Sequence, residues 1–259
     1  MSPGQRLKLY CFSHAGAGVS GFGRWRTRVG PDVDIRPVPL PGRDHRRRER
    51  RITDRRMLLA DLLRTLGPPP SGPYVLYGHS LGGLVAHTAT RALEEAGMNP
   101  PVLVVVGASP PPDAAAELVR DAELSDEELL RHLRRLDAVP ADARPEGVWR
   151  RAVLPVLRDD LRLARSLRDG ADKPVAAPLL AVSGRGDPLA TPRTMADWRH
   201  WTTGPFFERT LPGDHYFLRG RALPRLLRGA CRVALRTAAH SPDAPSATSR
   251  RTTMEKDSR

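Results

Sequence analysis

The chain has 259 residues, of which 40% are hydrophobic, and carries a net charge of +13. This is enough chain for one well-buried domain, and no apolar run approaches the roughly 20 residues that would cross a bilayer. The first ten residues lack the apolar core of a secretory signal, and two cysteines make no disulfide framework. We therefore expect a cytoplasmic protein without membrane contact.

The positive charge comes almost entirely from arginine, because lysine occurs only at Lys8, Lys173 and Lys256. Codon bias in a GC-rich genome and selection for a basic surface both explain this, and the choice stays open. A basic surface would attract an acidic partner. The densest basic stretch, Arg43 to Arg51, lacks aromatic residues and is interrupted by two acids. It predicts a solvated loop and no nucleic-acid site.

Strand and helix signals alternate along the chain. Short apolar runs bounded by turn residues predict strands at 7–12, 34–40, 74–77, 102–106, 179–182 and 206–211. Helical spacing of apolar residues predicts helices at 53–66, 81–96, 154–167 and 222–237. This alternation is typical of an α/β fold with a mostly parallel central sheet and helices on both faces.

The stretch from about residue 110 to 171 carries helical patterns but no strand. Ser125 is a good helix cap, and Glu128 follows three residues later as in a capping box. We expect a helical lid over a site, with extra packing as the alternative. One domain would then span 1–238, and the polar tail 239–259 is expected to be disordered.

A serine lies in a tight, glycine-rich turn between a predicted strand and a predicted helix. The turn reads Gly78-His79-Ser80-Leu81-Gly82. In this setting Gly-x-Ser-x-Gly is the nucleophile elbow of an α/β-hydrolase, where small neighbours let the serine adopt a strained backbone. Ser80 is therefore the candidate nucleophile, and the positive end of the following helix favours its reaction.

The acid and the histidine of a triad should follow the serine in that order. Asp187 comes after the strand at 179–182, and His215 comes 28 residues later, after the strand at 206–211. Loops at the carboxyl ends of strands build the sites of α/β sheets. Asp187 is the candidate acid and His215 the candidate base. Asp214 is a rival acid, but an adjacent side chain usually points elsewhere.

The loop after the first strand, Ser13 to Gly18, is built of small residues. We expect the backbone N–H groups of Ala15 and Leu81 to form the oxyanion hole. His14 and His79 are assigned structural roles. No His, Cys or Asp cluster has the spacing of a zinc site, so no metal or cofactor is expected.

With these residues identified, the chain resembles the type II thioesterases, the stand-alone editing enzymes of polyketide and non-ribosomal peptide synthases. The stretches that carry the resemblance are Cys11–Gly16, Leu40–Arg43, Gly78–Gly83, Ser125–Leu130, Leu154–Arg158, Gly184–Asp187, Trp198 and Gly213–Leu218. Two positions depart from the family pattern. Ser13 stands where proline is common, and Asp214 stands where glycine is common, next to the candidate base.

The resemblance implies hydrolysis of acyl groups from the phosphopantetheine arm of acyl-carrier or peptidyl-carrier domains by a monomer. Because carrier domains are acidic, a basic surface would steer them to the site. The triad is equally compatible with a chain-releasing thioesterase or an acyltransferase. An alternative of another class is a basic binding protein on a degenerate hydrolase scaffold, which the complete Ser80, Asp187 and His215 set disfavours.

Overall fold

Six parallel strands form one sheet in the order β2-β1-β3-β4-β5-β6. In the computed structural model, residues 6–67, 72–114, 123–135, 147 and 149–240 are described. The strands are β1 (Leu7–Phe12), β2 (Val33–Pro37), β3 (Tyr74–His79), β4 (Leu103–Gly107), β5 (Leu179–Gly184) and β6 (Phe206–Leu211). The α/β architecture with a parallel sheet expected from the alternating pattern is confirmed.

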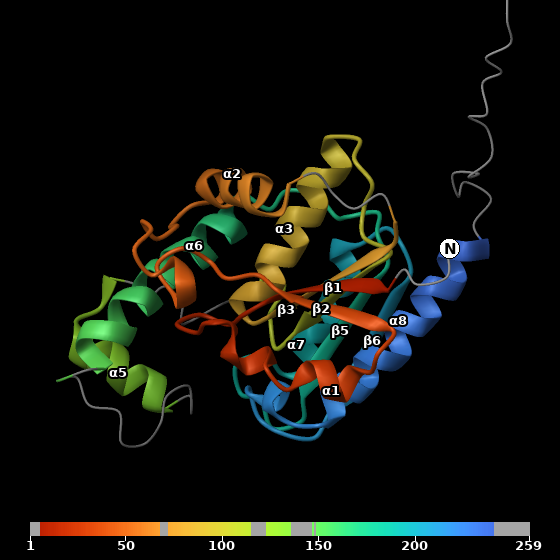
Figure 1. The fold of residues 1–259 in the computed structure, drawn as a ribbon. Coiled ribbons are helices and arrows are strands. Elements are labelled where there is room, and N and C mark those ends of the chain that lie inside the picture. Colours follow the sequence, from red (N-terminus) through yellow and green to blue (C-terminus); the bar gives the residue numbers. More distant parts are fainter. Residues whose placement is uncertain (1–5, 68–71, 115–122, 136–146, 148, 241–259) are drawn as a thin grey trace, which may run out of the picture.

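Helices cover both faces of this sheet (Figure 1). They are α1 (Trp25–Val29), α2 (Arg55–Leu66), α3 (Leu81–Glu95), α5 (Asp126–Arg135), α6 (Leu154–Asp169), α7 (Pro192–Ala196) and α8 (Ala222–His240). Alternation along β3 separates the two faces. Tyr77 packs on Trp25 with ring centroids 5.2 Å apart, whereas Leu76 lines an apolar pocket with residues of α2 and α3.

The central strands β3, β4 and β5 are buried on both sides, which explains why they read as continuous apolar runs. Their parallel register brings the ends of neighbouring strands together. Phe12 pairs with Gly78, and His79 pairs with Gly107, so β1, β3 and β4 end at one edge of the sheet. Loops that leave this edge carry the predicted site residues.

The inserted helices α5 and α6 lie between β4 and β5 in the chain, and α5 stands away from the sheet in Figure 1. A small cluster of leucines from these two helices forms a core of its own, made by Leu129, Leu133, Leu154, Leu157 and Leu161. The second half of α6 packs into the main core instead, through Leu163 and Leu167. The helix α6 therefore belongs to two cores.

The predicted capping box is present at the start of α5. The Ser125 hydroxyl donates to Glu128 over 2.6 Å, and the Glu128 N–H donates back to it over 3.3 Å. At the other end of the chain α8 continues to His240, two residues into the predicted tail, and 241–259 lies outside the described residues. Among the described residues, every helix is too short or too polar to span a bilayer.

Candidate active site

Ser80 occupies a sharp turn between β3 and α3. Its φ of 53° and ψ of −118° place it in a region that non-glycine residues rarely adopt. Two backbone hydrogen bonds hold it there. The Ser80 N–H donates to the Gly107 carbonyl at 2.8 Å, and the Gly83 N–H donates to the Ser80 carbonyl at 2.9 Å. This is the geometry expected of a nucleophile elbow.

The glycines around Ser80 are required by close backbone approach. A Cβ at Gly78 would run into the backbone of Gly82 and Gly83, closer than real Cβ contacts come. A Cβ at Gly82 would strike the carbonyl of Phe12, at the end of β1. The start of α3 thus lies directly against the end of β1, which brings the loop after β1 beside the elbow.

The structure joins His215 to Asp187. The His215 Nδ1 lies 2.9 Å and 3.1 Å from the two carboxylate oxygens, and both side chains are buried. The Asp187 carboxylate also accepts the backbone N–H groups of Leu189 and Ala190, at 2.9 Å and 3.1 Å. Because an ionised carboxylate only accepts, Nδ1 is the donor and Nε2 keeps its lone pair.

The rival acid Asp214 is used elsewhere. Its Oδ1 accepts the backbone N–H of Tyr216 at 2.7 Å, which closes a local turn on the surface. Among the described residues, Asp187 is the carboxylate that bonds to the His215 ring.

His79 has the structural role expected of it, but its hydrogen bond to the His215 segment was not predicted. Its Nε2 lies 2.7 Å from the backbone carbonyl of His215, so Nε2 carries the proton and donates. The Nδ1 then accepts the hydroxyl of Tyr77, also at 2.7 Å. Burial first, and the nearby His215 and His14 next, hold the pKa of His79 well below its usual value. His79 is therefore a neutral brace between the elbow and His215.

His14 lies at the same place, with its ring centroid 6.1 Å from that of His79 and 5.2 Å from that of Tyr216. Its Nδ1 donates to the carbonyl of Ala15 at 3.0 Å. Burial lowers the pKa of His14 to about 4. Near neutral pH, neither His14 nor His79 places a positive charge next to His215.

Two backbone N–H groups near Ser80 are available to donate hydrogen bonds to a negatively charged oxygen. Leu81 is the first residue of α3, where a helix leaves its N–H groups without internal acceptors. Ala15 lies in the loop that Gly82 packs against. Within the described part of the chain, neither amide donates to another backbone carbonyl. The loop is tied by Ser13, whose hydroxyl donates to the Gly18 carbonyl at 2.8 Å.

The expectation of a solvated arginine loop is wrong for three of its arginines. Arg43 and Arg51 form ion pairs with Asp160 and Asp159 of α6, and Arg46 is 5% exposed. Arg47, Arg48 and Arg50 are exposed, as expected. The ion pairs of Arg43 and Arg51 escaped the sequence analysis because their carboxylate partners lie 117 and 108 residues away in the chain.

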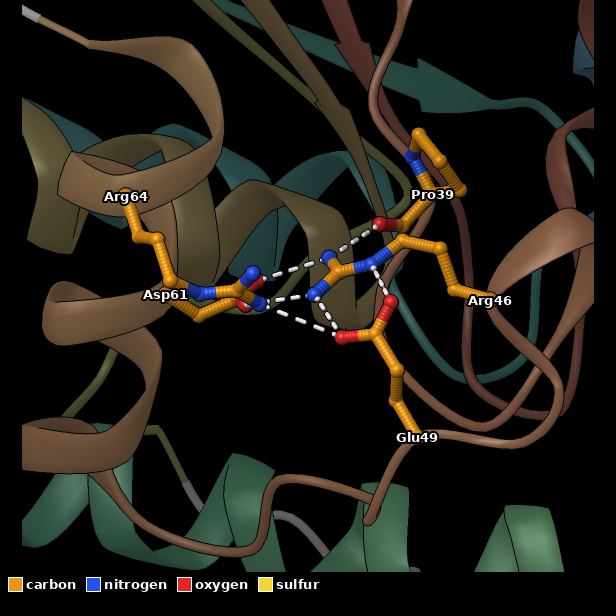
Figure 2. A network of polar contacts seen from close by, with 5 residues as sticks. All are labelled: Pro39, Arg46, Glu49, Asp61 and Arg64. Carbon is orange, nitrogen blue, oxygen red and sulfur yellow. Dashed lines mark hydrogen bonds and ion pairs between the residues drawn. The ribbon is translucent and has the colours of Figure 1, made fainter.

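Figure 2 shows the network around Arg46. Its guanidinium donates to both carboxylate oxygens of Asp61, at 2.6 Å and 2.8 Å, and to the carbonyl of Pro39 at 3.0 Å. Glu49 accepts two further bonds at 2.6 Å and 2.9 Å, and Arg64 reaches both acids from the outside. The network fastens the arginine-rich loop to α2.

No group of metal-ligating side chains that would hold an ion occurs in the described ranges. What the site offers is a strained serine, a histidine oriented by a buried carboxylate, and unused backbone amides. These groups suit covalent catalysis of acyl transfer. A doubly covered parallel sheet with such an elbow and an inserted pair of helices defines an α/β-hydrolase.

A family model described as a thioesterase domain matches residues 7–230. The chain therefore belongs to the thioesterase-domain family.

Several known proteins of this family are similar to the chain. A probable cadicidin biosynthesis thioesterase of Streptomyces griseus is 31% identical over 212 residues, which is 82% of this chain but 58% of that protein's length. RedJ, a thioesterase from the prodiginine pathway of Streptomyces coelicolor, is 33% identical with a TM-score of 0.74 over 88% of this chain and 90% of RedJ. BorB, a type II thioesterase from the borrelidin cluster, is 31% identical with a TM-score of 0.74, over 90% and 94%.

Proposed function

We propose that the protein is a type II thioesterase that hydrolyses acyl groups from the phosphopantetheine arm of carrier proteins. It would thereby clear stalled or misprimed polyketide or non-ribosomal peptide synthases. The observation that carries this proposal is the buried Asp187–His215 pair at the edge of the sheet where Ser80 forms the elbow. The similarity to BorB, a type II thioesterase from a biosynthetic cluster, supports the choice of substrate.

Ser80 is the nucleophile in the proposed reaction. The Nε2 of His215 takes the Ser80 proton as Oγ attacks the thioester carbonyl, and the amides of Ala15 and Leu81 stabilise the oxyanion. The carbon–sulfur bond breaks, and the pantetheine thiolate takes the proton from His215. Water then gives a proton to His215 and attacks the acyl-serine carbonyl. The bond between the acyl carbon and Ser80 Oγ breaks, His215 returns its proton to Oγ, and the free acid leaves.

Asp187 and the neighbouring histidines support the charge on His215. The carboxylate of Asp187 stabilises the imidazolium that forms when His215 takes a proton. The lowered pKa values keep His14 and His79 uncharged, so no like charge opposes that imidazolium. No step of this reaction calls for a metal or a cofactor.

The partner in this proposal is an acidic carrier domain, met in the cytoplasm by a monomer of this protein. The exposed side chains of Arg47, Arg48 and Arg50 would attract it. Their loop is tied at both ends to the lid helix α6, through Arg43 and Arg51. It lies next to α6 in Figure 1.

The test is the release of acyl groups from an acylated carrier protein, followed by intact-protein mass spectrometry. Ser80→Ala should lower the rate by at least about 10⁴-fold, since the nucleophile is lost. Ser20→Ala, a change at an exposed serine outside the elbow, serves as the control and should leave the rate unchanged.

Undiminished release by the Ser80 variant would end the proposal. The product also matters, because the proposal requires the free acid. An ester or amide product would indicate transfer to another acceptor. Labelling of Ser80 by a fluorophosphonate checks the nucleophile independently of the carrier.

A further inference from the structure

We infer that Asp160, on the lid helix α6, is a positioning residue for the oxyanion hole. Its carboxylate fixes the peptide unit that follows Ala15, so that the lid and the loop Ser13–Gly18, here called the catalytic loop, are held as one piece. The inference deepens the proposed function and rests on it.

The contacts of Asp160 are few and strong. Its Oδ2 accepts the backbone N–H of Gly16 at 2.7 Å. Arg43 donates to both oxygens of the same carboxylate, at 2.6 Å and 2.8 Å, and to the carbonyl of Ala17 at 3.1 Å. The Asp160 side chain is completely buried, so water takes no share of these bonds. Charge-assisted, bidentate pairs of this kind are the most directional hydrogen bonds in proteins.

These bonds act on the peptide unit between Ala15 and Gly16. The carbonyl of this unit accepts a hydrogen bond from Nδ1 of His14, and the N–H of the same unit donates to Asp160. Rotation of the unit would break both bonds. Because the unit follows Ala15 directly, its orientation sets the backbone of the residue whose N–H is the proposed oxyanion donor.

The link reaches the lid because α6 carries Asp160 in the part of the helix that packs in the lid core. Leu157 and Leu161, on either side of Asp160 in the sequence, pack in the lid core. Ala15 packs against that same core. A shift of α6 therefore moves the carboxylate and the loop together.

Stability alone gives a poor explanation for this arrangement. A buried ion pair often contributes no more to stability than well-packed apolar side chains in its place. Here the carboxylate also holds a backbone N–H in the loop that carries Ala15, and Arg43 holds the carbonyl of Ala17. The polar atoms of Asp160 and Arg43 therefore orient the catalytic loop.

The experiment compares Asp160→Asn with Asp159→Asn. Asp159 is the neighbouring residue of α6 and pairs with Arg51 and Arg162, so its variant weakens contacts of α6 without touching the loop Ser13–Gly18. An amide at position 160 places a donor against the guanidinium of Arg43, which loosens the whole cluster. The assay uses a small acyl-thioester, so that carrier docking plays no part.

Asp160→Asn should lower kcat about 100-fold with little change in KM, because the oxyanion donor is displaced and not the substrate contacts. Its affinity for a trifluoromethyl ketone, which forms an oxyanion on Ser80, should fall by a similar factor. Asp159→Asn should stay within twofold of the unchanged protein in both measurements.

Folded Asp160→Asn protein with unchanged kcat and inhibitor affinity would overturn the inference, as would an equal loss in Asp159→Asn. If Asp160→Asn does not fold, Arg43→Lys takes its place, since it keeps the charge and removes the bidentate pair. It should lower kcat and inhibitor affinity together, and unchanged values would overturn the inference. If the protein without any substitution shows no hydrolysis that depends on Ser80, the proposed function is refuted instead of this inference.

Discussion

Asp187 orients the imidazole of His215 through its two carboxylate oxygens. In Asp187→Asn the amide donates to Nδ1, which forces the proton onto Nε2 and leaves no lone pair for Ser80. We expect kcat to fall by about 10⁴-fold. Asp214→Asn is the matched control, because Asn still accepts the Tyr216 N–H on the surface. An equal loss in both variants, measured with circular dichroism to verify folding, would contradict the assignment.

His87 makes the stability of the protein sensitive to acid. It is buried against Trp198 and Trp201, and burial lowers its pKa to about 4 in spite of a hydrogen bond to the Trp201 backbone. The folded state holds the neutral form, whereas the unfolded chain takes up a proton below pH 6.5. The contribution of His87 to the free energy of unfolding is therefore fully present above about pH 6.5 and is lost as the pH drops toward 4.

Urea unfolding at pH 7 and pH 5 measures this effect. His87 should account for about 2 kcal/mol of the loss between these two values. His87→Phe removes the titrating group, so the variant should lose about 2 kcal/mol less than the unchanged protein over this interval. His200→Asn, at an exposed histidine, should leave the pH dependence unaltered. Identical pH dependence in all three proteins would refute the explanation.

Among the elements, α2 depends on the network around Arg46 (Figure 2). Removal of this guanidinium leaves Asp61, which is largely buried, with Arg64 alone. Arg46→Met should therefore cost about 3 kcal/mol of unfolding free energy in urea titrations. Arg46→Met combined with Asp61→Leu should recover much of that loss, because no unpaired charge remains buried.

Arg64→Ala is the control for this prediction. Arg64 contacts the same two acids, but its side chain is 65% exposed, so its loss should cost about 0.5 kcal/mol. If Arg46→Met cost as little, the network would have no part in holding the loop to α2.

The long elements were predictable because each carries its own signal. Every strand of the sheet gave an apolar run, and α2, α3, α6 and α8 showed helical spacing. The helices α1 and α7 were missed because five residues are too few to show a helical period. The strand β2 ends at Pro37, short of the predicted Leu40. Its partner β1 ends at Phe12, and the Val38 N–H still donates to the Cys11 carbonyl at 2.9 Å, so no β1 residue remains to pair with residues 39 and 40.

The site residues were predictable only where a residue type suited to catalysis directly follows a predicted strand. Ser80, Asp187 and His215 each follow a predicted strand, so the topology alone brings them to one edge. The contacts of His79 and Asp160 were missed because their partners lie 136 and 144 residues away, and no local sequence pattern indicates such contacts. Burial of Arg43 depends likewise on a carboxylate 117 residues further along.

At the scale of the whole molecule, the net charge is +13, and we expect the exposed arginines of the arginine-rich loop to be the part of it that attracts the carrier. We expect Arg47→Glu with Arg48→Glu to lower kcat/KM for an acylated carrier protein about tenfold at low salt. Their kcat/KM for a small acyl-thioester should not change. The difference should shrink at high salt because screening weakens the attraction.

Arg26→Glu with Arg225→Glu makes the same charge change at exposed positions on α1 and α8. This control should leave the carrier reaction nearly unaltered. An equal effect of both double variants would show that total charge, and not this loop, attracts the carrier.

The double membership of α6 has a consequence for engineering and for evolution. Its first half shares a core with α5, and its second half is rooted in the main core. If the proposed function holds, a graft meant to exchange acyl-chain preference should therefore be confined to the segment before Leu154, which carries α5. A graft that runs on through Asp169 would also replace the anchor of the loop next to Ser80. Natural sequences are expected to diversify on the α5 side of this boundary and to change little beyond it.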